Sequence, residues 1–143
     1  MNFIGNFGYV MVCIVGAIQY VNGGDGYPVG FPVNYVVTDG GILIHHTADG
    51  GLMSDLISDD DRICLTVVGR MEGARSRSAM AFGRIVRDDS LKERTLEAIV
   101  DKFVPEQGRT DAKSGIPHAM GMMIALRLDI EHITGKYVDK PGR

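Results

Sequence analysis

The sequence predicts a mainly β fold, a small six-stranded antiparallel barrel with peripheral α-helices, and three observations predict it. Runs rich in Val and Ile are separated by Gly- and Asp-rich turns along the first half of the chain, as in strands joined by tight hairpins. Nineteen glycines in 143 residues supply many turns. A single strongly periodic helical segment follows late in the chain, which fits helices at the periphery.

Length and charge indicate how many domains the chain has and which kinds of ligand it can bind. A chain of 143 residues suits one domain, residues 1–143, with 45% hydrophobic and 23% charged residues as in ordinary globular proteins. The net charge is −3, and no Lys or Arg precedes Arg62. This balance argues against nucleic acid as a partner. An anionic ligand would need backbone N–H groups or cations from the second half of the chain.

Six segments have the pattern of strands. Pro28 and Pro32 each lack a backbone N–H, which indicates an edge strand or a bulge at the second segment. The last segment alternates apolar and charged residues, as a half-buried strand does. The expected strands are Val10–Val21, Tyr27–Thr38, Ile42–His46, Arg62–Val68, Ser78–Val86 and Leu126–Glu131.

Two helices are predicted. The spacing of apolar residues from Leu52 to Ile57 suits one face of a short helix. A second helix follows Ser90, which is placed to cap the N–H of Glu93, and Pro105 ends it. The polar segment Glu106–Pro117 contains Gly and Pro and is expected to be a mobile loop.

The apolar run Tyr9–Ile18 is predicted to be a buried strand. It lacks the basic flank of a signal peptide and is shorter than the roughly 20 residues that span a bilayer. We therefore expect a cytoplasmic protein without a membrane association. Cys13 and Cys64 lie in apolar runs, which indicates buried thiols rather than a disulfide or a zinc site.

The segment Ile42–Gly51 is the best candidate for a site. His45 and His46 point to opposite sides of a strand, and Thr47 adds a hydroxyl donor. Gly50 and Gly51 let backbone N–H groups approach a phosphate. Taken alone, a histidine pair at a strand end is more often structural or surface-exposed, and no other catalytic motif is present.

Five segments of the chain form a further pattern by their order and spacing: Asp25–Tyr35, the strand that begins Ile44-His45, Ile63–Gly69, Ser78–Arg84 and Ile130–Lys136. This pattern resembles the nitroimidazole-resistance branch of the pyridoxamine 5′-phosphate oxidase-like flavin-binding split barrels. The resemblance covers roughly Asp25–Lys136. It implies a six-stranded antiparallel split β-barrel with peripheral α-helices.

The resemblance also implies a homodimer with FMN at the subunit interface, and the residues predict no metal site. It places His45 beside the flavin as the candidate catalytic residue. Gly51 and Leu52 fall where relatives hold the phosphate, and Arg77 and Ser78 approach from the barrel or the partner. The remaining residues on strands that border the cofactor are Val33, Asn34, His46 and Thr47.

The chain departs from the family pattern in two places. Leu52 stands where relatives often have Lys or Arg, and the loss of such a charge-assisted contact costs roughly 1.5–3 kcal/mol. The N-terminal helix usual in the family is also not expected, because Met1 comes almost directly before the first strand.

The leading hypothesis is an FMN-dependent oxidoreductase that passes electrons from a reduced nicotinamide to a small acceptor, with nitroaromatics as one candidate class. The alternative is a non-catalytic dimeric module that holds flavin, deazaflavin or haem; a third hypothesis is a scaffold without a ligand. Oxidation of pyridoxamine phosphate is disfavoured, because no second basic cluster is visible for the phosphate of that substrate.

Overall fold

Six antiparallel strands and three helices make up most of the part of the chain that this computed structural model describes, residues 15–20, 29–48, 55, 57–69 and 75–139. The strands are β1 (Val15–Tyr20), β2 (Val29–Thr38), β3 (Gly41–Thr47), β4 (Arg62–Val68), β5 (Arg75–Arg87) and β6 (Met123–Asp139). The helices are α2 (Lys92–Phe103), α3 (Glu106–Ser114) and α4 (Ile116–Met120), preceded by a 3₁₀ turn, η2 (Asp89–Leu91).

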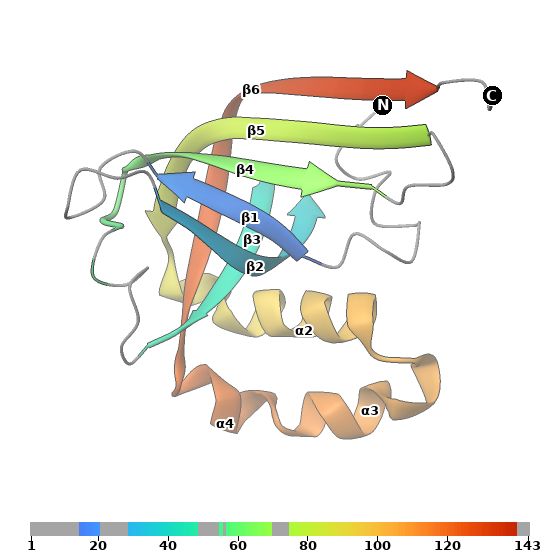
Figure 1. Cartoon of the computed structure of the whole chain (residues 1–143). Coiled ribbons are helices and arrows are strands. Elements are labelled where there is room, and N and C mark those ends of the chain that lie inside the picture. Colours follow the sequence, from blue (N-terminus) through green and yellow to red (C-terminus); the bar gives the residue numbers. More distant parts are fainter. Residues whose placement is uncertain (1–14, 21–28, 49–54, 56, 70–74, 140–143) are drawn as a thin grey trace.

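The strands close a barrel in the order β1-β2-β3-β6-β5-β4 (Figure 1). Strand β1 closes it by pairing with β2 on one side and with β4 on the other, where Ala17 lies opposite Thr66. All neighbours are antiparallel. The predicted mainly β barrel with peripheral helices is therefore confirmed.

The core fills the barrel with side chains from alternate positions of the strands. Tyr35, Ile44, Leu65 and Leu128 are each 0% exposed and belong to one cluster. Small residues on β5, among them Ala81, leave room for these larger side chains. The alternation of buried and exposed positions along β4 and β5 is the pattern of strands with one face on a core.

Strands β5 and β6 form a long ribbon that continues beyond the barrel (Figure 1). The ladder shifts register at Phe82/Gly83, and a Cβ on Gly83 would lie 2.0 Å from the backbone oxygen of Asp129. Only glycine allows this close approach. The final strand, Met123–Asp139, is much longer than the predicted Leu126–Glu131. Its apolar Ile130 is 37% exposed rather than buried.

The helices lie together beneath the barrel (Figure 1), between β5 and β6 in sequence. The prediction that Glu106–Pro117 is a mobile loop was wrong, because the segment forms α3 and the start of α4. Helix α3 buries no residue and lacks an apolar stripe, so its sequence gave no helical signal. Arg109 instead fixes it, donating to the carbonyl oxygens of Val104 and Asp101.

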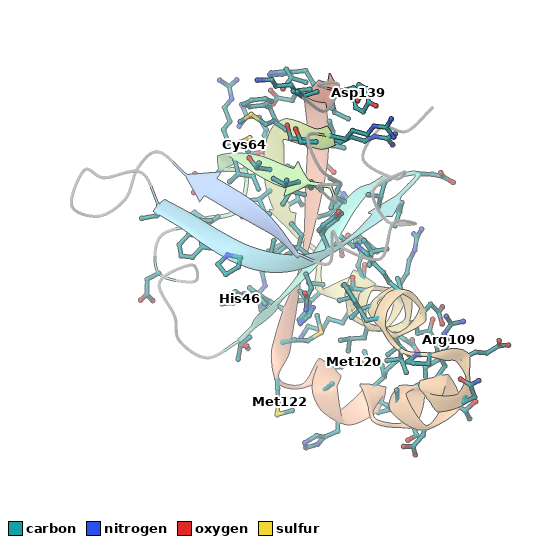
Figure 2. All side chains as sticks on the ribbon, turned by 45° about the vertical axis from the view of Figure 1, so that its right-hand side comes forward. His46, Cys64, Arg109, Met120, Met122 and Asp139 are labelled. Carbon is teal, nitrogen blue, oxygen red and sulfur yellow. The ribbon has the colours of Figure 1, made fainter. Side chains whose placement is uncertain are left out.

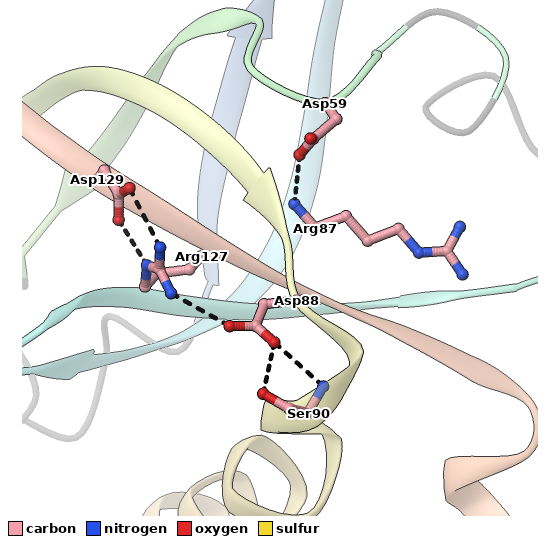
Figure 3. Close-up of polar contacts among 6 residues, drawn as sticks. All are labelled: Asp59, Arg87, Asp88, Ser90, Arg127 and Asp129. Atoms are coloured by element: carbon pink, nitrogen blue, oxygen red, sulfur yellow. Dashed lines mark hydrogen bonds and ion pairs between the residues drawn. The ribbon is translucent and has the colours of Figure 1, made fainter.

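Helix α2 follows the prediction closely, but its start does not use Ser90 as the cap. The carboxylate of Asp88 accepts from the backbone N–H and the hydroxyl of Ser90 (Figure 3). Ser90 itself lies within η2, and α2 begins at Lys92 without a side-chain cap. The side-chain cap is therefore that of Asp88 on the 3₁₀ turn η2, two residues before Ser90.

Other expectations fall partly outside the described residues. Cys13 and most of the predicted helix Leu52–Ile57 are not described. Cys64 is a half-buried free thiol. None of the described helices has the length and apolar character needed to cross a bilayer.

Candidate functional site

The candidate site lies where strands β2 and β3 part. Their ladder runs from Thr38 opposite Gly41 to Tyr35 opposite Ile44 and goes no further in the described residues. Beyond this point β2 pairs with β1, whereas β3 pairs with β6. A pocket of about 330 Å³ opens here, and it is lined by Pro32, Val33, Asn34, His45, His46 and Thr47.

Five of the residues predicted from the sequence thus meet in one pocket, and Pro32 is the sixth. The sequence showed Pro32 only as a residue without a ladder donor. In the structure Pro32 is exposed and pairs with Ala17 of β1, at a position where β3 has already left β2. A proline is tolerated at a strand position with one open side, so Pro32 marks the place where the two strands separate.

His45 is the most perturbed titratable group of the pocket. Burial lowers the pKa of its imidazole, and the neighbouring His46 lowers this pKa further. Its Nδ1 is buried and has no hydrogen-bond partner among the described residues. An unsatisfied buried polar atom costs about 1–3 kcal/mol. His45 therefore lines the pocket with an imidazole that burial favours in its neutral form.

His46 has a fixed orientation beside it. Its Nδ1 lies 2.6 Å from the carbonyl oxygen of Thr47. Because a carbonyl oxygen only accepts, Nδ1 of His46 carries the proton. In Figure 2 His46 lies on the β2–β3 side of the molecule, far from Arg109 on the helices.

The polar groups around the pocket suit an uncharged ring with hydrogen-bonding atoms at its edge. Asn34 offers both a donor and an acceptor, Thr47 a hydroxyl, and His45 one ring nitrogen, while Pro32 and Val33 supply apolar surface. The volume lies at the small end of the range for ligand sites, about 300–1,000 Å³. The pocket therefore fits the ring end of a flavin; the phosphate end would lie outside these six residues.

Two predicted site residues, Arg77 and Ser78, do not line this pocket. They lie on the far part of the β5–β6 ribbon, opposite Tyr137 and Lys136 of β6. The strand distance from Ala125, which faces His45, to Tyr137 is about 40 Å at the usual rise per residue. The guanidinium of Arg77 instead lies 5.3 Å from the centroid of the Tyr137 ring.

Gly51 and Leu52, predicted to lie at the phosphate, are outside the described residues. Within the described part of the chain, no three His, Cys, Asp or Glu side chains gather in a way that could hold a metal ion.

The closed six-stranded barrel with peripheral helices has the split-barrel fold. The model of the family described as pyridoxamine 5′-phosphate oxidase matches residues 11–137. The chain belongs to this family. No curated protein matches the chain.

Several solved structures share the fold. The FAD and heme binding protein from Mycobacterium smegmatis superposes with a TM-score of 0.78 at 19% identity, over 96% of this chain and 70% of that one. A putative 5-nitroimidazole antibiotic resistance protein from Bacteroides thetaiotaomicron gives 0.64 at 16% identity, over 96% and 85%. The heme storage protein HutZ from Vibrio cholerae gives 0.61 at 12% identity, over 92% and 90%.

Proposed function

We propose that this chain is an FMN-dependent oxidoreductase that passes electrons from a reduced nicotinamide to a small acceptor, with nitroaromatics as the first class to test. The observation that carries the proposal is the pocket between β2 and β3, which is lined by His45, a residue whose buried Nδ1 has no partner among the described residues. The family and the similarity to a putative nitroimidazole resistance protein support it.

The residues of the pocket have separate roles in this proposal. A bound flavin supplies the two-electron redox chemistry. Asn34 and Thr47 orient polar atoms at the edge of the ring, and Pro32 and Val33 contact its apolar part. His45 binds the acceptor or moves a proton at Nδ1, since a histidine with a lowered pKa is mostly neutral near pH 7.

The first experiment is the absorption spectrum and the mass of whatever small molecule copurifies with the full chain. We expect flavin bands and the mass of FMN, and bleaching of the bands when NADH or NADPH is added without oxygen. Reoxidation by a nitroaromatic would then show turnover. A colourless protein that leaves the fluorescence of added FMN unchanged would overturn the proposal.

The same experiment can be repeated with His45→Ala and, as a matched control, His118→Ala on the exposed surface of α4. We expect the His45 variant to lose acceptor reduction by roughly 10²–10⁴-fold if the imidazole moves a proton. The His118 variant should retain full activity. Equal rates in both variants would remove His45 from the mechanism.

A binding module for haem is the second candidate, and one observation favours it. A neutral imidazole is the form that ligates iron, and His45 has a lowered pKa and a ring nitrogen without a partner among the described residues. Two solved structures with the same fold are described as heme proteins. Haem bound through His45 would give a Soret band that His45→Ala abolishes. Bound flavin that no nicotinamide reduces would point to a non-catalytic flavin module instead.

We further propose that the chain is a homodimer with the cofactor at the interface. Large apolar side chains are exposed on β4, β5 and β6: Val68 is 51% exposed, Met80 37%, Ile133 40% and Tyr137 52%. Val68 and Met80 lie on one face of these strands, and Ile133 and Tyr137 on the other, because successive strand residues alternate between faces. Exposed apolar groups favour association. A partner that covers them would remove these side chains from water.

Light scattering coupled to size exclusion tests the dimer. We expect twice the chain mass of 15.5 kDa. Met80→Glu should shift the protein toward the monomer, whereas Gln107→Glu, which adds the same charge on exposed α3, should not. A monomeric wild type at assay concentration would refute the dimer.

A further inference from the structure

Strand β6 has one open edge over its second half. Strand β3 pairs with β6 only from Met123 to Leu128, whereas β5 pairs with it as far as Asp139. Among the described residues, no strand lies on the β3 side of β6 after Leu128. Figure 1 shows this half of β6 at the rim of the molecule, with β5 along its other edge. Its outer edge is therefore a row of backbone N–H and C=O groups that another strand can pair with.

This edge lacks the features that usually keep edge strands apart. Such strands are often short, or carry Pro or several Lys. Residues 132–139 pair with β5 without interruption beyond the register shift, and they contain no Pro and the single Lys136. Ile133 is 40% exposed and Tyr137 52%, and both lie on the same face because they are four residues apart in a strand. The edge therefore combines open backbone groups with exposed apolar side chains.

A second copy of β6 can pair with this edge only in certain registers. Two identical antiparallel strands are related by a two-fold axis perpendicular to their sheet, and facing residues have their side chains on the same face. The axis therefore passes beside one residue, which lies opposite itself in the second copy. Gly135 is the centre of residues 132–138 and is exposed. An axis at Gly135 thus pairs the whole of this segment and brings no two side chains together at its centre.

In this register the apolar residues of the edge meet. Ile133 lies opposite Tyr137 of the second copy, and the symmetry forms this pair twice. A β-branched residue opposite an aromatic one stabilises an antiparallel pair of strands. The other facing pairs bring no like charges together: Thr134 with Lys136, and His132 with Val138.

A shift of the axis by one residue removes this match. An axis at Lys136 would place the two Lys136 side chains opposite each other, and like charges in that position are destabilising. An axis at Thr134 would leave Ile133 opposite Gly135, which has no side chain to contact it. Both alternatives lose the two pairs of Ile133 with Tyr137. The edge is therefore self-complementary in one register.

The acidic residues that flank the segment are already paired with arginines. Oδ1 of Asp139 lies 3.1 Å from Nε of Arg75, and Oε1 of Glu131 lies 3.3 Å from Nε of Arg84. Asp139 and Glu131 would face each other at the two ends of the ladder. The arginines offset their repulsion there, so the ends do not oppose the pairing of the centre.

We infer that β6 pairs antiparallel with β6 of a second copy, centred on Gly135, so that one sheet continues across the dimer. The inference rests on the homodimer of the proposed function and deepens it by naming the strand that joins the subunits. Strand β4 pairs with β5 only as far as Ser78, so the end of the β5–β6 ribbon has two strands among the described residues. Sheets of three or more strands are more stable than a lone pair, and the second copy supplies the additional strands.

Paired cysteines test the register directly in the full chain. Ile133→Cys and Tyr137→Cys are combined in a background in which Cys13 and Cys64 are replaced by Ser. Facing residues have Cα atoms about 4.5–5.5 Å apart, within the range of about 4.4–6.8 Å that a disulfide needs. Within one chain the two positions are about 13 Å apart and cannot be joined. We therefore expect a covalent dimer on a non-reducing gel.

The two single cysteine variants are the matched controls. In each of them the nearest cysteine of the second copy is four residues along the strand, about 13 Å away, so no covalent dimer should form. Single variants that cross-link as readily as the double variant would overturn the register.

A charge on the edge gives a second, independent test. Ile133→Lys should raise the dissociation constant of the dimer by about tenfold, because it removes both apolar pairs and adds a charge to the edge. Met122→Lys is its control, since Met122 is 54% exposed and lies before the start of β6, outside the ribbon. Light scattering at several protein concentrations measures both constants.

The remaining outcomes separate this inference from the proposed function. A wild-type dimer in which the double cysteine variant forms no covalent dimer, and in which Ile133→Lys has no effect, overturns the inference and leaves the homodimer standing. A monomeric wild type overturns the inference and the homodimer together. Neither result changes the flavin spectrum that tests the oxidoreductase proposal.

Discussion

Lys102 and Tyr35 join helix α2 to the end of the barrel through two contacts at once. The ammonium group donates to the Tyr35 carbonyl oxygen at 2.7 Å and lies 3.8 Å from the centroid of the Tyr35 ring. Tyr35 is the last residue of β2 that pairs with β3 before the two strands part. The contact therefore fixes the strand next to the pocket-lining Asn34.

Replacing Lys102 with Met should lower the free energy of unfolding by about 2 kcal/mol, because a half-buried charge-assisted hydrogen bond and a cation–π contact are both lost. Urea denaturation measures the change. Lys113→Met is the matched control: its ion pair with Asp101 is exposed, and its loss should cost less than about 1 kcal/mol. Equal losses would show that the Lys102 contact adds no stability.

Asp88 should be the critical residue at the start of α2. Its carboxylate accepts from Ser90 and pairs with Arg127 of β6 (Figure 3). Asp88→Ala removes both contacts and should destabilise the fold by about 1–2 kcal/mol. Asp89→Ala removes the half-exposed ion pairs of that carboxylate with Arg87 and Lys92, and should have a smaller effect in the same thermal melts because exposed pairs contribute little. A larger loss in the Asp89 variant would contradict this assignment.

Gly83 should tolerate no side chain. A Cβ there would lie 2.0 Å from the Asp129 backbone oxygen, and a backbone atom cannot move aside as a flexible side chain can. We expect Gly83→Ala to cost more than about 3 kcal/mol or to prevent folding. Gly40→Ala, where nothing lies within 4 Å, should leave the denaturation midpoint almost unchanged. Normal stability of the Gly83 variant would mean that the ladder can slip at the bulge.

The lowered pKa of His45 predicts that the stability of the fold depends on pH. Its folded-state pKa lies below the usual value of about 6.5. At pH values between the folded-state and the unfolded-state pKa of His45, the unfolded chain binds more protons than the folded chain. The free energy of unfolding therefore rises with pH in this range and levels off above about pH 6.5. Acidification below that point should therefore destabilise the protein.

Denaturation curves at several pH values test this with two variants. His45→Gln should flatten the dependence below about pH 6.5, because the neutral amide takes up no proton. His132→Gln, on the exposed part of β6, should keep most of the wild-type slope. If His45→Gln leaves the slope unchanged, another group causes the acid sensitivity.

Much of the fold could be predicted because local patterns and tertiary structure agree in those segments. Strand β4 has the predicted bounds, Arg62–Val68, since its alternating residues face a core on one side only. Helix α2 ends before Pro105 as expected, because its apolar spacing and its stop signal coincide. The fold prediction failed at α3, where a polar helix is held by the guanidinium of Arg109 rather than by an apolar face.

The candidate site, like the fold, could be predicted from the sequence only in part. His45, His46 and Thr47 are consecutive residues of one strand, so their proximity follows from the sequence. The alternation of a strand also predicts which of them point to opposite faces. Their meeting with Pro32, Val33 and Asn34 depends on where the β2–β3 ladder ends. No local signal gives the end of a ladder, because it depends on which strand each partner pairs with next.

By itself the sequence determined the class of fold, most of the strands and five of the six residues around the pocket, since these follow from periodicity, turn residues and family pattern. Only the tertiary structure decided that Arg77 and Ser78 lie on a distant ribbon and that Asp88 caps the 3₁₀ turn before α2. It also decided that the Nδ1 of His45 is buried without a partner among the described residues. The physical reason is that burial, ion pairing and distance are set by contacts between segments far apart in the chain.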